Sequence, residues 1–251
     1  MNRGIHNAFL LTLSDVLQTT LLEGRDPVSV PSGTDLYLPG DEINWIYFPT
    51  SGLISLISVM DNGDEGETGV VGREGALGVL ESLGSGCVLY RAVVQIDLVA
   101  WRIPASRFTA VFGESPALRT VVAAHTELNL AELRQSLACR SHHSVTARLA
   151  WWLLECQDRT GLKVLALTQE FLGAMLGSQR STVSQASSDL KQAGLIQYSR
   201  GVIEVLDRPG LERRACECYA RVAGYRRTIE GEPEWAQGPD HQAQRRLFRA
   251  S

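Results

Sequence analysis

The side chains best suited to chemistry form one polar run between positions 178 and 191. They are hydrogen-bonding or positively charged and carry little aliphatic area: Ser178, Gln179, Arg180, Ser181, Thr182, Ser184, Gln185 and Lys191. In the major groove of DNA, arginine can bind guanine, glutamine can bind adenine, and serine or threonine can reach base edges or phosphates. The run therefore favours binding to double-stranded DNA.

Two short helices joined by a glycine are expected to position this run. Thr168 is a good N-cap for the first helix, and Gly177 permits a sharp turn into the second. Val183 and Leu190 give that second helix its anchor. Two strand-like segments follow and enclose Arg200, as in the wing of a winged helix, which would bring Arg200 to phosphate. A polar helix after a glycine turn is also typical of a solvated αα-hairpin, and the wing favours DNA binding over that alternative.

The N-terminal half has a different residue pattern. From residue 28 to about residue 103, glycine turns separate short strand-like runs, which predicts a small β-barrel or sandwich after a short N-terminal helix. From Pro116 to about Leu137 the chain has helical spacing without internal proline or glycine, which predicts a helix of roughly 20 residues, or about 30 Å. Leu130, Leu133 and Leu137 lie off its first apolar stripe, so a second face can pack against another copy of the chain.

These features resemble the Crp/Fnr family of bacterial transcription regulators over nearly the whole chain. Arg180 takes the place of the family's base-reading arginine, and Ser181 and Gln185 occupy the two neighbouring specificity positions. The resemblance implies an α+β fold with four parts: a cyclic-nucleotide-binding-like β-roll sensor domain (1–115), a long dimerisation helix (116–140), a winged helix-turn-helix DNA-binding domain (141–225) and a C-terminal tail (226–251). One helix is expected over residues 211 to about 225. The tail is expected to be disordered, to contact DNA nonspecifically or to dock as a strap.

The N-terminal domain departs from the family pattern at its candidate effector site. Gly72, Glu74 and Gly75 lie in a segment that resembles the phosphate-binding cassette, whose amides can cradle a phosphate, and Arg91 is its candidate partner. The key side chains stand one residue away from their positions in the family's cyclic-AMP binders. Because such an offset turns a strand side chain to the opposite face, we do not expect cyclic AMP as the effector. Whether there is an effector, and which, stays open.

Cysteines and histidines give weaker signals. Redox-sensing members of the family bind an iron-sulfur cluster through cysteines near the N-terminus, whereas the first cysteine here is Cys87, so no cluster of that type is expected. Cys216 and Cys218 form a Cys-x-Cys pair without neighbouring ligands in the sequence, and we interpret them as helix cysteines and expect no metal ligands. His125 and the pair at 142–143 are interpreted as polar contacts rather than haem or metal ligands.

Composition agrees with a soluble two-part protein of 251 residues. Residues 1–138 contain 8 basic and 16 acidic residues, and residues 139–251 contain 16 and 12, so the positive charge gathers in the predicted DNA-binding half. No apolar run of about 18 residues predicts a membrane span. The five scattered cysteines suit a reducing compartment, so a cytoplasmic location is expected. No motif of a catalytic loop or nucleophile elbow is present, and we expect no enzymatic activity.

The sequence therefore predicts a homodimeric transcription regulator that binds an inverted-repeat operator. An effector at the N-terminal domain would control it, and RNA polymerase would be a further partner of an activator; activation and repression are both left open. The alternative is a small-ligand sensor that acts through a protein partner, with the winged helix serving as a protein contact.

Overall fold

The computed structural model describes residues 5–199 and 201–230. Two short helices open the described chain, α1 (Ala8–Leu11) and α2 (Asp15–Leu22). Asn7 begins the first of them, because its side-chain oxygen accepts a hydrogen bond from the Leu10 amide at 3.0 Å. The amide group of Asn7 also donates to Pro49 O and Gly75 O, so this entry segment is fixed to the sheet that follows.

An antiparallel five-stranded sheet forms the N-terminal domain. Its strands are β1 (Val28–Val30), β2 (Asp35–Tyr37), β3 (Trp45–Val59), β4 (Glu65–Val71) and β5 (Arg91–Pro104), in the order β1-β5-β3-β4, with β2 also paired to β5. The pairing of β3 with β5 shifts register around Gly52, whose φ is +86° and whose Cβ position lies 2.3 Å from Asp97 O. Only glycine fits there, and the irregularity lets the long strands bend.

Three helices accompany the sheet, and they are α3 (Val79–Leu83), α4 (Ala105–Glu114) and α5 (Pro116–His142). Of these, α4 packs against the sheet, and α5 continues toward the C-terminal domain. Phe48 and Phe108 are fully buried in the core between sheet and α4. Ser115 caps α5 by accepting from the Leu118 amide at 3.2 Å, and Pro116 occupies the first turn, where its missing N–H costs nothing.

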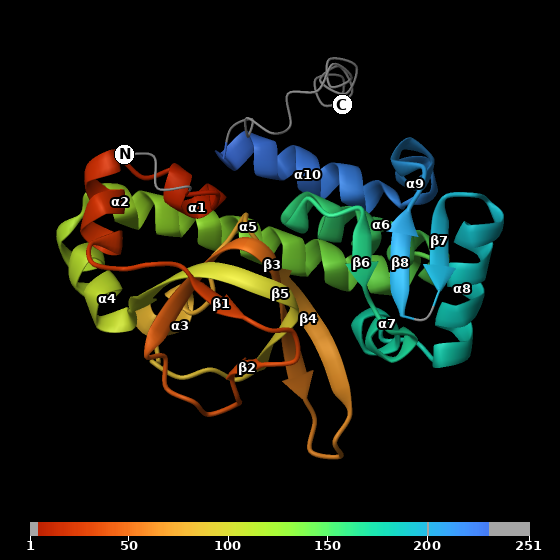
Figure 1. Cartoon of the computed structure of the whole chain (residues 1–251), viewed down its shortest axis with the longest axis horizontal. Helices are drawn as coiled ribbons and strands as arrows, with labels where there is room; N and C mark the ends of the chain where they lie inside the picture. The colour runs from red at the N-terminus through yellow and green to blue at the C-terminus, as the bar shows by residue number, and fades with distance from the viewer. Residues whose placement is uncertain (1–4, 200, 231–251) are drawn as a thin grey trace.

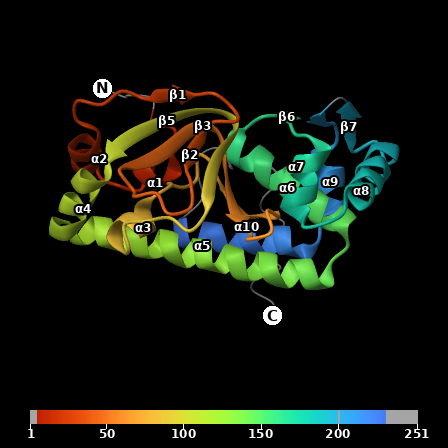
Figure 2. The same ribbon diagram turned by 90° about the horizontal axis from the view of Figure 1, so that it is seen from below.

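The long helix α5 organises the rest of the molecule (Figure 1). Its buried face carries Leu118 and Val122 against the N-terminal domain, and Leu128 farther along the helix is also buried. The sheet lies toward the N-terminal end of α5 and the smaller helical domain toward its C-terminal end, and Figure 2 shows the same arrangement from below. No helix among the described residues is long and apolar enough to cross a membrane.

The C-terminal domain combines helices with a small sheet. Its elements are α6 (Val145–Thr160), β6 (Val164–Ala166), α7 (Gln169–Leu176), α8 (Arg180–Gln192), β7 (Ile196–Ser199) and β8 (Val202–Val205), and the sheet has the order β6-β8-β7. Leu149, Leu153 and Leu190 are buried in its core, together with Leu53 of β3. The two domains therefore share packed surface.

The single helix predicted over residues 211 to about 225 is wrong. Two helices stand there, α9 (Arg208–Arg214) and α10 (Glu217–Glu230). Asp207 starts the first by accepting from the Gly210 amide at 2.9 Å, and Ala215 is extended (φ −64°, ψ 154°), which breaks the helix. α10 then runs back alongside α5 (Figure 1) and takes in residues 226–230 of the predicted tail. The remainder of that tail, 231–251, lies outside the described residues.

Candidate nucleic-acid interface and sensor cassette

A tight helix-turn-helix presents the polar run identified in the sequence. Thr168 caps α7 by accepting from the Phe171 amide at 3.1 Å. Gly177 ends α7 with a φ of +55°, in the left-handed region that favours glycine, and α8 starts three residues later. Val183 and Leu190 are fully buried, so one face of α8 packs on its own domain and the opposite face is directed outward.

The outward face of α8 carries most of the predicted DNA-binding residues. Exposed are Gln179, Arg180, Ser181, Thr182, Gln185 and Lys191, and half-buried are Ser178 and Ser184. At 100° per residue, Ser181 and Gln185 lie opposite the buried Val183 and Leu190, while Arg180 and Lys191 flank that face. The arrangement presents one positive side chain near each end of the helix and hydrogen-bonding groups between them.

Three of these side chains are engaged within the chain. Gln185 Nε2 donates to Asp189 Oδ1 at 2.8 Å, and Ser184 Oγ accepts from Gln169 Nε2 at 3.3 Å. Ser178 Oγ donates to the Leu176 carbonyl at 3.2 Å, within the turn between α7 and α8. Ser178 thus stabilises the turn. Ser184 and Gln185 must break these hydrogen bonds within the protein before they can contact a base.

The wing follows directly after α8. β7 and β8 pair antiparallel from Ile196 with Val205 to Ser199 with Val202. β6 pairs on the other side of β8, from Val164 with Glu204 to Ala166 with Val202. Arg200 lies outside the described residues, so its predicted contact with phosphate stays a prediction.

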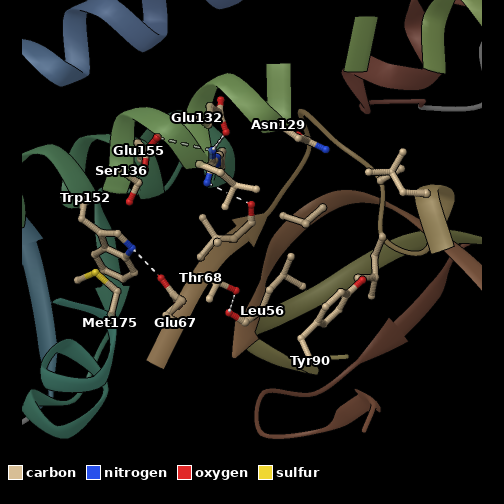
Figure 3. Close-up of a pocket in the computed structure, with 18 of the residues that line it drawn as sticks. Leu56, Glu67, Thr68, Tyr90, Asn129, Glu132, Ser136, Trp152, Glu155 and Met175 are labelled. Carbon is tan, nitrogen blue, oxygen red and sulfur yellow. Dashed lines mark hydrogen bonds and ion pairs between the residues drawn. The ribbon is translucent and has the colours of Figure 1, made fainter. Parts of the chain in front are cut away.

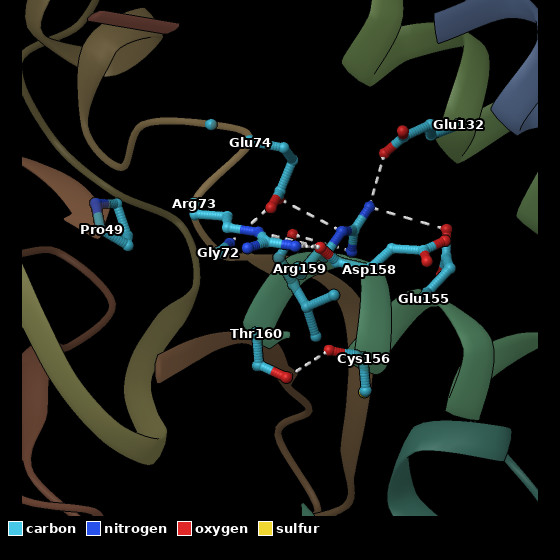
Figure 4. Close-up of polar contacts among 12 residues, drawn as sticks. Pro49, Gly72, Arg73, Glu74, Glu132, Glu155, Cys156, Asp158, Arg159 and Thr160 are labelled. Carbon is cyan, nitrogen blue, oxygen red and sulfur yellow. Dashed lines mark hydrogen bonds and ion pairs between the residues drawn. The ribbon is translucent and has the colours of Figure 1, made fainter. Parts of the chain in front are cut away.

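The predicted cassette is a compact turn at the end of β4 whose amides are bonded within the chain. The Gly72 amide donates to Glu74 Oε1 at 3.0 Å, and the Gly75 amide donates to Gly72 O at 3.2 Å. The Arg73 amide donates to Arg159 O at 3.4 Å, and the Arg73 guanidinium donates to Asp158 O at 2.8 and 3.1 Å. In this arrangement the turn binds the end of α6 (Figure 4).

Arg159 of α6 occupies the space in front of this turn. Its side chain, only 8% exposed, lies 3.2 Å from Glu74, 3.0 Å from Glu132 of α5 and 3.6 Å from Glu155 of α6 (Figure 4). A Cβ added at Gly72 would lie 2.7 Å from Arg159 Cβ, so α6 and the turn are in direct backbone contact. The sequence shows only the i,i+4 pair of Arg159 with Glu155, because Glu74 and Glu132 come from elements that only the tertiary fold brings close to Arg159.

Comparisons with known proteins match both halves of this structure. A cyclic nucleotide-binding domain is matched over residues 27–133, and a Crp-like helix-turn-helix domain over residues 147–214. A crystal structure of a CRP/FNR-family transcriptional regulator from Thermus thermophilus has a TM-score of 0.60 and 26% identity, and the match covers 76% of this chain and 98% of that one. The chain belongs to the Crp/Fnr family of transcription regulators.

Two curated relatives extend the comparison. The Global nitrogen regulator of Synechococcus elongatus is 23% identical over 203 residues, which is 76% of this chain and 91% of that protein. The transcriptional regulator SdrP of Thermus thermophilus is 31% identical over 106 residues, 40% of this chain and about half (52%) of SdrP. The predicted family and α+β architecture are confirmed, and the family consists of transcription regulators, which are not enzymes.

A cavity of about 300 Å³ lies between the domains of this Crp/Fnr regulator (Figure 3). β3, β4, α3, α5, α6 and α7 all contribute to its wall. Its polar side chains include Glu67, Thr68, Tyr90, His125, Asn129, Glu132, Ser136 and Glu155. Residues of the N-terminal domain, the long helix α5 and the C-terminal domain all face the cavity.

Burial alters the acidity of several groups in this wall. Burial raises the pKa of Glu67 to about 7, and the carboxylate accepts from Trp152 Nε1 at 3.2 Å. Burial also raises the pKa of Glu155 to about 7, against the effect of Arg159. The pKa of His125 falls to about 4 for the same reason, and its Nε2 lies 3.2 Å from Asn129 Nδ2. The junction therefore holds groups that change charge within reach of neutral pH.

The four predicted effector residues do not converge on this cavity. Arg91 is the first residue of β5, and it makes ion pairs with Asp35 at 2.7 Å and with Glu65 at 3.2 Å. Gly72, Glu74, Gly75 and Arg91 are not among the described residues that line the cavity. The structure thus brings the first three together in the cassette and leaves Arg91 apart from them.

Cys218 lies in helix α10 as expected, but Cys216 and Cys218 are not without neighbouring ligands. Cys216 lies in the break before α10, and Cys139 and His143 from the end of α5 lie beside the pair. Their ligand atoms, three thiols and an imidazole nitrogen, all fall within 4.8 Å of one another. The sequence missed this group because the pattern of a single Cys-x-Cys hides partners more than 70 positions away, although the spacing of Cys139 and His143 places both on one helix face.

Proposed function

We propose that this regulator binds an inverted-repeat DNA operator as a homodimer and reads its bases with α8. The observation that carries the proposal is the orientation of that helix. Val183 and Leu190 hold it on its own domain, which leaves Arg180, Ser181 and Gln185 exposed on a surface rich in hydrogen-bonding groups. Arginine and glutamine at such positions can discriminate guanine and adenine in the major groove.

The long helix α5 supports the homodimer. Leu130, Leu133 and Leu137 are 43%, 48% and 70% exposed, and their spacing of three and four places them along one side of the helix. Such an apolar stripe is typical of a helix that packs against its own copy. A two-fold axis along this contact would present two copies of α8 to successive major grooves about 34 Å apart, which requires an inverted repeat.

The cavity between the domains supports control by a small effector. A ligand there would contact the sensor domain, α5 and α6, and it would switch the protein if it bound one arrangement of these parts better than another. We do not propose cyclic AMP held by the cassette, because the Gly72, Arg73 and Gly75 amides are bonded within the chain and Arg91 is paired elsewhere. RNA polymerase is the further partner if the protein activates transcription.

Selection of bound sequences from random DNA tests the proposal. We expect an enriched inverted repeat, and we expect the affinity for it to fall steeply as salt is raised, because phosphate contacts release counterions. Random duplex of equal length is the control and should bind more weakly at every salt concentration. If no sequence is enriched and binding is equally weak on all DNA, the proposal fails and the alternative of a protein partner takes its place.

A further inference from the structure

Three thiols and one imidazole meet where the long helix ends and the last helix begins. Cys139 and His143 stand four residues apart at the end of α5, so both face the same way, and His143 is the residue that ends the helix. Cys216 and Cys218 flank the first residue of α10. Cys139 also lines the cavity between the domains, but neither that cavity nor the DNA-binding surface accounts for the gathering of these four side chains.

The distances among these atoms suit a single tetrahedral ion. Cys139 Sγ lies 3.5 Å from Cys216 Sγ, and His143 Nδ1 lies 3.4 Å from Cys139 Sγ and 3.5 Å from Cys218 Sγ. Zinc bound at about 2.3 Å by sulfur and about 2.0 Å by nitrogen holds its ligand atoms roughly 3.5 to 3.8 Å apart. The ligands of a four-iron cluster each bind a different iron and would have to be farther from one another.

The groups around the four donors also suit a metal. His143 Nε2 lies 3.2 Å from Glu217 Oε2, so the carboxylate can hold the Nε2 proton and leave Nδ1 free to bind the ion. Gln135 Nε2 donates to Cys218 Sγ at 3.0 Å, a contact that stabilises a thiolate. Three thiolates with one imidazole select zinc over magnesium or calcium, which prefer oxygen.

We infer that Cys139, His143, Cys216 and Cys218 bind one Zn²⁺ per protomer. Cys139, Cys216 and Cys218 are 2%, 8% and 0% exposed, and all four positions of the tetrahedron come from protein, as in a structural rather than a catalytic zinc site. The ion ties the start of α10 to the joint between α5 and α6. It thereby fixes the direction in which the DNA-binding domain leaves the long helix.

Metal content of the full chain, purified with reductant and without chelator, tests the inference first. We expect one zinc per protomer by mass spectrometry. Cys216→Ser and Cys218→Ser should each lose most of it, because three ligands bind far more weakly than four. Cys87→Ser is the matched control, since Cys87 is exposed and lies in the sensor domain, and it should keep the full zinc content.

Cobalt supplies a second readout that does not depend on folding of the cysteine variants. The metal-free wild-type chain titrated with Co²⁺ should show thiolate-to-cobalt absorption that saturates at one equivalent. Glu217→Gln keeps all four ligands but loses the carboxylate beside His143, so it should give the same spectrum with an affinity lower by about 10- to 100-fold.

Three results would overturn the inference. One is folded wild-type protein that gives no cobalt-thiolate absorption and retains no zinc. The second is equal zinc content in the Cys216→Ser and Cys87→Ser proteins. The third is iron with acid-labile sulfide in place of zinc. None of these readouts depends on DNA binding, so the failure of this inference and the failure of the proposed function are distinguishable.

Discussion

At the scale of single residues, the junction between the domains is built from buried charges. Arg159 stands among three carboxylates from three segments, and Glu67 lies in the same wall with a hydrogen bond from Trp152. Buried ions persist only when they are paired or when their pKa shifts far enough to neutralise them. Arg159 is paired, whereas the pKa of Glu67 is raised. The protonation of Glu67 should therefore change the free energy of unfolding with pH.

Glu67→Gln tests this protonation. Burial raises the pKa of folded Glu67 from 4.5 to about 7, so the folded state holds a proton that the unfolded chain releases. The resulting stabilisation is fully present below about pH 4.5 and is lost as the pH rises to about 7. The free energy of unfolding of the wild type should therefore fall relative to that of the variant by roughly 1 kcal/mol per pH unit in this window. The free energy of unfolding is measured by denaturant titration at a series of pH values. If it changes with pH in the same way for the wild type and for Glu67→Gln, the assignment is contradicted.

At the scale of elements, the turn between α7 and α8 sets how the recognition helix is presented. Gly177→Ala should cost roughly 1 to 2 kcal/mol, because an L side chain is strained at a φ of +55°. Gly113→Ala is the matched control: Gly113 lies in α4, has no positive φ and has open space at its Cβ position, so this change should raise stability slightly. Thermal unfolding measures both, and equal shifts would show that the turn is not strained.

The exposed stripe of α5 makes its own prediction. Leu137→Asp should turn a dimer into folded monomers, because a carboxylate within an apolar helix contact is left without a partner. Leu89→Asp is the control, since Leu89 is 90% exposed in the sensor domain, and it should remain dimeric. Sedimentation velocity separates the species. If both variants are monomeric, or both are dimeric, this stripe is not the dimer contact.

Elements governed by local chemistry could be predicted from the sequence. Thr168 and Gly177 mark the ends of α7 by capping and by a left-handed turn, and both predictions are confirmed. Contacts between distant segments could not be predicted: Arg159 reaches Glu74 across 85 positions, and Cys139 reaches Cys216 across 77. Neither pair leaves a periodic pattern in the chain. The break between α9 and α10 at Ala215 could not be predicted either, because the helix propensities of the neighbouring residues give no sign of a helix end there.

At the scale of the whole molecule, the Arg159 guanidinium contacts the cassette, α5 and α6 at once. Arg159→Met should cost about 3 to 5 kcal/mol, because it leaves the buried Glu74 without its cation and leaves Glu132 paired with Arg226 alone. Hydrogen exchange at the Gly72 and Arg73 amides should rise with it. Arg107→Met is the control: it removes a surface ion pair with Glu23 and should cost less than about 1 kcal/mol. Equal losses in the two variants would show that Arg159 does not hold the domains together.

A footprint on the selected operator tests the central claim most directly. Arg180→Ala removes the arginine proposed to read a base and should weaken specific binding by about 1 to 3 kcal/mol, so protection of both half-sites should be lost at wild-type concentrations. Arg119→Ala removes the same charge from an exposed position at the far end of α5 and should protect the operator like the wild type. An unchanged footprint with Arg180→Ala would contradict DNA reading by α8.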